Sequence, residues 1–326
     1  MDNVTHTLVG LMLSRAGLNP GEKGAPLMIM LAANAPDMDT YSFFTDSLTY
    51  LQVHRGYTHS LLFAPLVALV PLLLVKAFTR TRFTLVTLAT YAGCLVAVLS
   101  HLLLDWTNVY GVRLMLPFSG KWYRLDSTDI IDPVILGVLF LAVAAPALSG
   151  LLTSEMGGRK TRGPGRGWAW FALAAVLLYD TGRWMAHDRV ISIIDAHNYR
   201  GAPAERVNAF PVRFTVMRWR GVVEGDGFIY EVPVDLTVDF DAAGGHTEYP
   251  AISSPAIDAA RATRTFQVFE NFDQLPFWSL LPIEDTLRVE LLDLRFGSLQ
   301  RPGFEAVAFV EPGGRVDRAY FSFGVR

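Results

Sequence analysis

The chain has 326 residues, 51% of them hydrophobic, and its mean hydropathy of +0.30 is higher than that of an ordinary soluble protein of this length. Its net charge of −3 excludes the basic bias that is typical of nucleic-acid-binding proteins. The single cysteine, Cys94, excludes an internal disulfide and a thiolate cluster, so any metal must be held by histidine and carboxylate side chains.

The N-terminal residues lack the positive n-region and the cleavage site of a signal peptide. We therefore expect the chain to keep its N-terminus and to insert through its own membrane segments. Two short apolar pieces follow, at residues 4–16 and 26–35. Because each is marginal for a full span, we expect a tilted helical hairpin or a re-entrant pair buried against other helices.

Longer apolar runs cover residues 61–78, 83–104, 133–152 and 168–186, and each has the length and polarity of a membrane helix. The predicted fold class is therefore a polytopic α-helical membrane domain, with about four long and two short helices, that occupies residues 1–187.

Lysine and arginine residues set the expected orientation of these helices. Two links between long helices are basic and fall on one side of the membrane, which predicts that this side is cytoplasmic. Their basic residues are Lys76, Arg80, Arg82, Arg159, Lys160, Arg162 and Arg166. The loops 37–60 and 105–132 and the chain after residue 186 would then face outward. Arg113, Lys121 and Arg124 lie in one of the loops expected to face outward, and these basic residues argue against this orientation.

After residue 187 the pattern changes to short alternating runs that are separated by Gly-rich turn signals. These runs predict a β-rich extramembrane domain at residues 188–326, which begins with a short amphipathic helix at 190–200. The expected strands are 210–220, 228–240, 264–269, 286–296, 305–310 and 318–325.

His101 and Asp105 are the candidate site residues that are easiest to interpret, because a spacing of four residues places both side chains on one helical face. A charged group near the end of an apolar helix costs roughly 2.5–3.5 kcal/mol even on the lenient insertion scale. Metal coordination would offset that cost, because the cation balances the carboxylate and accepts the imidazole lone pair. A hydrogen bond at the helix end is the simpler alternative.

The expected topology brings further histidine and aspartate residues to the same membrane face. The predicted metal ligands are His6, Asp37, His54, His59, His101 and Asp105. Ligand sets of this kind suit zinc, manganese or iron, with zinc favoured, and they could hold one or two ions. In the alternative interpretation, the loop histidines are interfacial residues and the paired aspartates cap a helix.

Four further residues are candidates for catalytic roles. Asp39 or Asp126 could act as the general base, and Arg55 or Arg183 could bind an anionic group of the substrate. A structural pairing of Arg183 with Asp180 remains the alternative for that arginine.

At these residues the sequence resembles the YdjM-like family of inner-membrane-bound metal-dependent hydrolases, which is described as LexA-regulated in enterobacteria. The resemblance covers roughly residues 1–190. It rests on Thr5-His6-Thr7 with Gly10, on Ala35-Pro36-Asp37-Met38-Asp39, on His54-Arg55-Gly56-Tyr57-Thr58-His59-Ser60 and on His101-Leu102-Leu103-Leu104-Asp105. It implies a divalent metal, hydrolase chemistry and a location in the bacterial inner membrane, but no particular substrate.

The resulting hypothesis is a membrane-bound, metal-dependent hydrolase that acts on a lipid-borne or membrane-proximal ester, with a phosphoester favoured. The expected partners are membrane lipids and such a substrate, with no nucleic acid. One alternative is a non-catalytic metal-binding membrane protein whose β domain binds a partner. A transporter is a third and weaker interpretation, because the long apolar runs carry almost no charge apart from Asp180 and Arg183.

Overall fold

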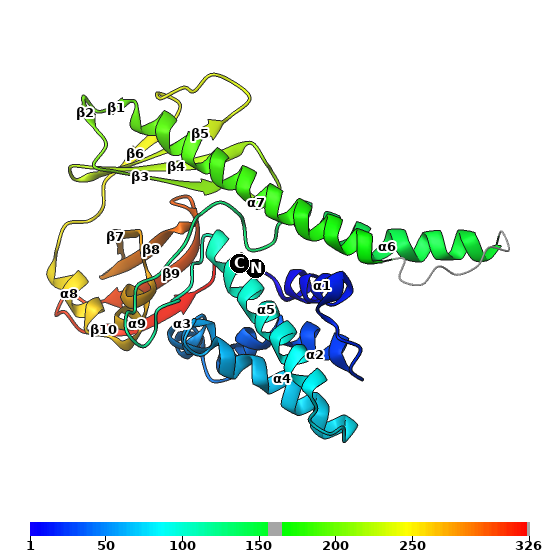
Figure 1. Ribbon diagram of the computed structural model, residues 1–326. Helices are drawn as coiled ribbons and strands as arrows, with labels where there is room; N and C mark the ends of the chain where they lie inside the picture. Colours follow the sequence, from blue (N-terminus) through cyan, green and yellow to red (C-terminus); the bar gives the residue numbers. More distant parts are fainter. Residues whose placement is uncertain (156–164, 325–326) are drawn as a thin grey trace. The chain divides into compact units, whose positions relative to one another are not determined.

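The computed structural model describes residues 1–155 and 165–324 and divides into two compact units. The first unit combines Met1–Asp39 with Arg55–Ala186, and the second combines Thr40–His54 with His187–Arg326 (Figure 1). The short segment Thr40–His54 thus groups with the C-terminal part of the chain, although it lies between two candidate site motifs.

The helices of the first unit follow from apolar sequence and local capping. Asp2 caps the first helix by accepting hydrogen bonds from the backbone N–H groups of Val4 and Thr5, and Thr84 forms a capping box with Thr87. In chain order the elements are α1 (Asn3–Leu13), the π-helix η1 (Ser14–Leu18), α2 (Ala25–Ala32), the 3₁₀ helix η2 (Ala35–Phe44), the 3₁₀ helix η3 (Tyr57–His59), α4 (Ala64–Thr79), α5 (Leu85–Thr107), α6 (Pro133–Glu155) and α7 (Arg166–Asp195).

Two apolar clusters organise this unit. In the first, α2 packs against α4 and α5 through fully buried side chains such as Ile29, Ala68 and Ala97. In the second, α1 packs with α6 and the first half of α7 through Met12 and Leu139, among others. The helix α1 also packs against α2 and α5, so the helix that carries His6 is positioned from two sides.

The prediction of a polytopic domain with about six membrane helices is wrong. Within the described residues, only α5 is long and apolar enough to cross a membrane by itself, or two segments qualify if one bent helix pair counts as a broken span. The helix α4 has 16 residues. It measures roughly 24 Å against a hydrocarbon core of about 30 Å. The described apolar part of α6 is similarly short.

The helix α7 fails as a span for a different reason. It has 30 residues, but Asp180, Arg183 and the charged residues that follow lower its apolar character along half its length. The hydropathy pattern extended the predicted run only to residue 186, whereas the helix continues to Asp195 and includes most of the predicted amphipathic segment 190–200. Arg159, Lys160 and Arg162, which supported the predicted orientation, lie outside the described residues.

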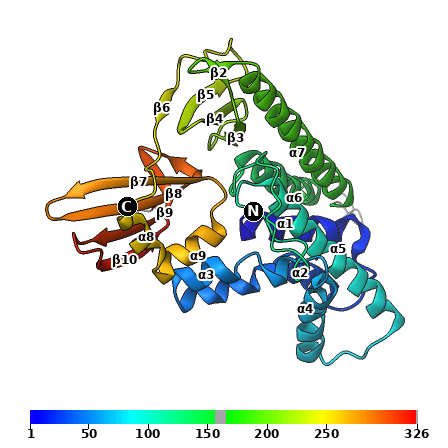
Figure 2. The same ribbon diagram turned by 90° about the vertical axis from the view of Figure 1, so that its left-hand side faces the viewer.

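The second unit contains two four-stranded antiparallel sheets, each with its strands in consecutive order (Figure 2). One sheet comprises β3 (Arg206–Pro211), β4 (Arg218–Gly225), β5 (Phe228–Asp235) and β6 (His246–Glu248); the other comprises β7 (Pro276–Ile283), β8 (Thr286–Ser298), β9 (Arg301–Val310) and β10 (Val316–Ser322). A short pair, β1 (Asn198–Tyr199) and β2 (Ala202–Pro203), precedes them. Arg220 of β4 donates hydrogen bonds to Glu231 of β5 and to the carbonyl of Leu294 in β8, which links the two sheets.

Three helices complete this unit: α3 (Ser47–Val53), α8 (Pro255–Arg261) and α9 (Arg264–Phe272), and the last two pack against the sheet that contains β8. A strand was predicted at 264–269, but this segment is helical because Thr263 caps it and its apolar residues bury one helical face. The predicted strand 210–220 is instead the end of β3, a turn and the start of β4.

Candidate metal centre

Four side chains from three elements converge in the first unit. Asp37 comes from η2, His59 from η3, and His101 and Asp105 from the C-terminal end of α5. One donor atom of each lies within 4.8 Å of the donor atoms of the other three. His59, His101 and Asp105 are fully buried and Asp37 is 7% exposed. The four donors therefore form a single buried cluster.

The pair on α5 is arranged as its spacing predicts. The Nε2 atom of His101 lies 3.3 Å from Oδ2 of Asp105, one helical turn further along. The same Nε2 atom lies 3.6 Å from Oδ1 of Asp37. The α5 ring thus faces one carboxylate from its own helix and one from η2.

The backbone carbonyl of Ala33, at the C-terminal end of α2, determines which nitrogen of His101 carries a proton. The Nδ1 atom lies 2.7 Å from the carbonyl oxygen of Ala33, which can only accept a hydrogen bond. Nδ1 is therefore the donor, and in the neutral ring Nε2 presents its lone pair to the cluster. Metal-binding histidines are commonly oriented by such a backbone carbonyl.

A hydroxyl group determines the tautomer of His59 in the same way. Thr58 donates its only hydroxyl proton to Oδ2 of Asp39 over 2.6 Å, and the hydroxyl oxygen of Thr58 lies 3.0 Å from Nδ1 of His59. Because the hydroxyl proton is already used, Nδ1 of His59 must be the donor in that contact. Asp39 also lies 3.4 Å from this nitrogen. In the neutral ring, the Nε2 atom of His59 carries the lone pair, as in His101.

The two Nε2 atoms lie only 3.2 Å apart. Oδ2 of Asp105 is 3.4 Å from Nε2 of His59, and Oδ1 of Asp37 is also 3.4 Å from it. Two lone pairs and two carboxylates directed at one buried point repel one another unless a cation, either a proton on a ring or a metal ion, lies between them.

His6 stands beside this cluster on α1. Its ring stacks on His101 with 3.7 Å between centroids, and its Nε2 atom is 3.5 Å from Oδ1 of Asp105. Both ring nitrogens are buried without a hydrogen-bond partner. Burial, followed by the charge of His101, lowers the pKa of His6 to about 3, so this ring is neutral near pH 7.

The carboxylates are balanced by neighbouring groups. Asp105 is 3.0 Å from Nη2 of Arg55 and contacts the amino group of Met1. For Asp37, burial acts to raise the pKa, but the nearby rings of His101 and His59 outweigh it and hold the pKa well below its usual range. Asp37 is therefore ionised at any physiological pH.

These features fit a divalent metal ion. The donor set of two imidazoles and two carboxylates, with His6 adjacent, suits zinc, manganese or iron and contains no thiolate. Oδ2 of Asp105 also lacks a hydrogen-bond partner, in addition to both nitrogens of His6. Buried polar atoms without such partners are rare in folded proteins, and a coordinated ion would account for Oδ2 of Asp105 and for one nitrogen of His6.

The remaining predicted site residues are not members of this four-residue cluster. His54 ends α3 and belongs to the second unit. The guanidinium of Arg55 is shared between Asp105, Asn108 and the carbonyl of Gly111.

In the loop between α5 and α6 and on α7, the other candidates make local contacts. Arg124 contacts Asp126, and Arg183 donates to the carbonyl of Ser127. Asp132 accepts from the backbone N–H of Val134 and so caps α6, whose first residue is Pro133.

Three groups that contribute to the site were not predicted from the sequence: the carbonyl of Ala33, the hydroxyl of Thr58 and the amide of Asn108. Thr58 offered a signal, since it directly precedes His59 in the most specific motif. Asn108 lies one turn after Asp105, to which its amide nitrogen is 3.4 Å away. A backbone carbonyl leaves no trace in a sequence, so Ala33 could not have been found.

Comparison with known proteins assigns the family. Residues 1–190, which include every residue of the cluster, match the family described as YdjM inner membrane protein. The chain belongs to this family. The family description places it among inner membrane proteins, and α5 is the helix best suited to cross that membrane.

A related protein, the uncharacterized protein YfhP of Bacillus subtilis (strain 168), is 33% identical over 147 residues. The match covers 41% of this chain and 43% of that relative, so the chain spans less than half of its length. No solved structure is similar enough to match.

Proposed function

We propose that this protein is a membrane-bound, metal-dependent hydrolase that acts on a lipid-borne or membrane-proximal phosphoester. The observation that carries the proposal is the convergence of two imidazole Nε2 atoms and two carboxylates on one buried point, with the two Nε2 atoms 3.2 Å apart. Zinc is the ion we favour, because it accepts mixed nitrogen and oxygen ligands at low coordination number.

A divalent ion bound there would supply Lewis-acid chemistry, activating a water molecule and polarising the scissile phosphoryl group. The protein's own contribution is orientation. Ala33 and Thr58 hold the rings of His101 and His59 with their lone pairs directed inward. The contact of Arg55 with Asp105 keeps one carboxylate oxygen in place. Asp37, the most exposed of the four donors, marks the side from which a substrate would approach.

The candidate general bases differ in their surroundings. Asp39 accepts hydrogen bonds from the hydroxyl of Thr58 and the backbone N–H of Arg55 and faces the ring of His59. In our proposal Asp39 is a positioning residue that acts through His59. Asp126 remains the proposed proton acceptor. Arg183 is the proposed contact for an anionic substrate group, because the guanidinium of Arg55 already forms an ion pair with Asp105.

Membrane lipids are the substrate class we favour because α5 carries two of the donors at its end and is also the best candidate to cross the membrane. A site at the end of such a helix lies close to lipid headgroups. We propose that this end faces the outer side of the inner membrane, because Lys76, Arg80 and Arg82 precede the opposite end of α5 and basic residues favour the cytoplasmic side.

A non-catalytic metal-binding protein is the second candidate function. The full burial of His59, His101 and Asp105 favours it, since three of four ligands offer no surface to a substrate. In that case the β sheets of the second unit would bind a partner.

The decisive experiment measures metal content and hydrolysis on the purified full-length protein in detergent. We expect about one equivalent of zinc in the wild type. We also expect release of headgroup phosphate from phosphatidic acid or a related phospholipid panel. His101→Ala and Asp105→Asn should each abolish both. His246→Ala, which removes a half-exposed histidine of the second unit, serves as the matched control and should change neither.

The two candidate functions predict different outcomes. Bound metal without hydrolysis across the lipid panel would assign the second function. Metal content unchanged in folded His101→Ala and Asp105→Asn proteins would refute the metal centre itself, and elution at the wild-type volume in size-exclusion chromatography establishes folding for each variant.

A further inference from the structure

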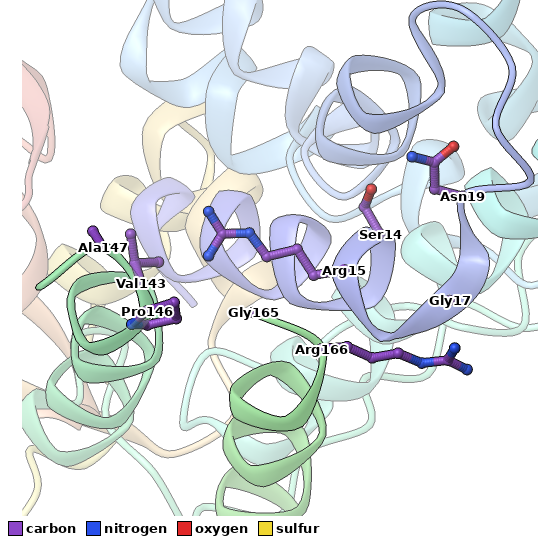
Figure 3. A pocket seen from close by; sticks show the side chains of 9 residues that line it. All are labelled: Ser14, Arg15, Gly17, Asn19, Val143, Pro146, Ala147, Gly165 and Arg166. Carbon is purple, nitrogen blue, oxygen red and sulfur yellow. The ribbon is translucent and has the colours of Figure 1, made fainter. Parts of the chain in front are cut away.

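A cavity of about 630 Å³ lies in the first unit, beside η1 and the start of α7 (Figure 3). Arg15 follows His6 by nine residues, which along a helix corresponds to roughly 14 Å. The cavity is therefore separate from the metal cluster. It is lined by Ser14, Arg15, Gly17, Asn19, Val143, Pro146, Ala147, Gly165 and Arg166.

Two guanidinium groups from different elements line this cavity. Arg15 belongs to η1 and Arg166 begins α7 (Figure 3). Each runs past a glycine of the other segment: a Cβ atom on Gly17 would lie 3.3 Å from the guanidinium of Arg166, and one on Gly165 would lie 3.5 Å from Cδ of Arg15. The two glycines thus leave space beside the two cations.

The positive charge in this cavity has no counter-ion within the described residues. None of the lining residues is acidic. The Nη1 atom of Arg15 is buried without a hydrogen-bond partner. A buried guanidinium N–H that donates to nothing is unfavourable by roughly 1–3 kcal/mol or more, which an anion in the cavity would recover. The positive end of the α7 dipole adjoins it as well.

The other walls are of mixed polarity. Ser14 and Asn19 line one part, and the α6 residues Val143, Pro146 and Ala147 line another (Figure 3). Asn19 uses its carbonyl oxygen to accept from the backbone of Gly21, which leaves its amide N–H₂ group as the donor. A ligand that fits this lining is anionic at one end and apolar at the other. A volume of this size accommodates a headgroup and the first carbons of an acyl chain.

We propose that this cavity binds the phosphate group of an anionic phospholipid, with Arg15 contacting the phosphate, Arg166 adding positive charge to the cavity wall, and the α6 wall contacting the start of an acyl chain. Arginine suits phosphate because its planar fork donates two parallel hydrogen bonds. The site would anchor one end of the α1, α6 and α7 cluster to the lipid headgroups of an inner membrane protein, independently of any catalysis at the metal centre.

The test uses the full-length protein in nanodiscs of phosphatidylcholine alone or with 20% phosphatidylglycerol, and native mass spectrometry counts the bound phosphatidylglycerol. Arg15→Gln with Arg166→Gln is the test variant. Arg80→Gln with Arg82→Gln is the matched control, because it removes the same charge from exposed arginines of the same unit. Loss of a headgroup-adjacent arginine weakens anionic lipid binding roughly fivefold, so the test variant should bind roughly 25-fold more weakly.

The proposal requires that the wild type and the control retain phosphatidylglycerol equally. Equal loss in the control would indicate unspecific charge attraction and would overturn it, as would unchanged retention in the test variant. Inorganic phosphate is tested in parallel on detergent-solubilised protein by isothermal titration. If phosphate binds tightly to the wild type and phosphatidylglycerol is not retained, the ligand is a soluble phosphate and the lipid assignment is wrong.

Discussion

At the scale of single residues, the hydrogen bonds of His59 and His101 determine which ring nitrogen of each histidine faces the cluster. The hydroxyl of Thr58 has one proton, and its donation to Asp39 leaves Nδ1 of His59 as the only possible donor to Thr58. In the neutral ring the lone pair therefore lies on the other nitrogen, Nε2, which faces the cluster. Asp39 stabilises this arrangement from outside the ligand cluster.

We predict that Asp39→Asn raises the dissociation constant for zinc about 10- to 100-fold, because outer carboxylates orient histidine ligands and raise their basicity. Competition with a chelating fluorophore on purified protein measures this constant. Asp188→Asn, at an exposed carboxylate of α7, is the control and should leave the constant unchanged.

The same variant tests the role assigned to Asp39. A positioning residue changes metal affinity, whereas a general base changes the turnover of the metal-loaded protein. Unchanged zinc affinity together with lost hydrolysis would make Asp39 the general base and not a positioning residue.

At the scale of elements, the close approach of α1 and α2 places His6 next to the carbonyl that orients His101. Gly10 permits this approach: a Cβ atom there would lie 2.8 Å from Cβ of Ala33 and 3.0 Å from Cα of Met30. The second neighbour is backbone, which cannot move without shifting α2. The absence of a side chain at position 10 is therefore a requirement of helix packing.

We predict that Gly10→Ala destabilises the protein by about 1–3 kcal/mol, the usual cost of overpacking a tight contact. Gly137→Ala is the matched control, because a Cβ atom on Gly137 of α6 meets nothing within 4 Å. That change should stabilise the helix by up to about 1 kcal/mol through propensity alone. Thermal unfolding of both variants in the same detergent compares them, and a Gly10→Ala protein as stable as the control would contradict the packing argument.

At the scale of the whole molecule, the metal ligands Asp37, His59, His101 and Asp105 all belong to the first unit, and the two sheets belong to the second. A ligand stabilises the part of a protein whose folded form binds it, by about 2.7 kcal/mol at a concentration 100-fold above the dissociation constant. Metal removal should therefore act unevenly along the chain.

We predict that chelation accelerates amide hydrogen exchange in η2, η3 and the C-terminal turns of α5 and leaves β4, β5 and β8 unchanged. Hydrogen exchange with mass spectrometry, with and without dipicolinic acid, resolves these segments. The His101→Ala protein is the control, because it should show no response to the chelator. Equal acceleration in the strands would mean that the units unfold as one, and no acceleration anywhere would mean that no metal stabilises the fold.

How far the sequence alone predicts this molecule depends on the range of the interaction. The spacing of His101 and Asp105 determined that they share a helical face, and alternation in 286–296 and 305–310 predicted strands that the structure contains. Both patterns are local. The histidine and aspartate motifs also indicated metal chemistry, because the donor atoms are in the residues themselves.

Only the tertiary structure decided the rest. The number of helices able to span a membrane depended on where caps and packing end each helix, and a hydropathy window does not register these ends. The segment 264–269 became helical because its cap and its buried aromatic face outweighed its strand pattern. The orientation of His101 depends on Ala33, 68 residues away in the sequence. A contact of that range forms only when two elements pack, so no local pattern in the sequence encodes it.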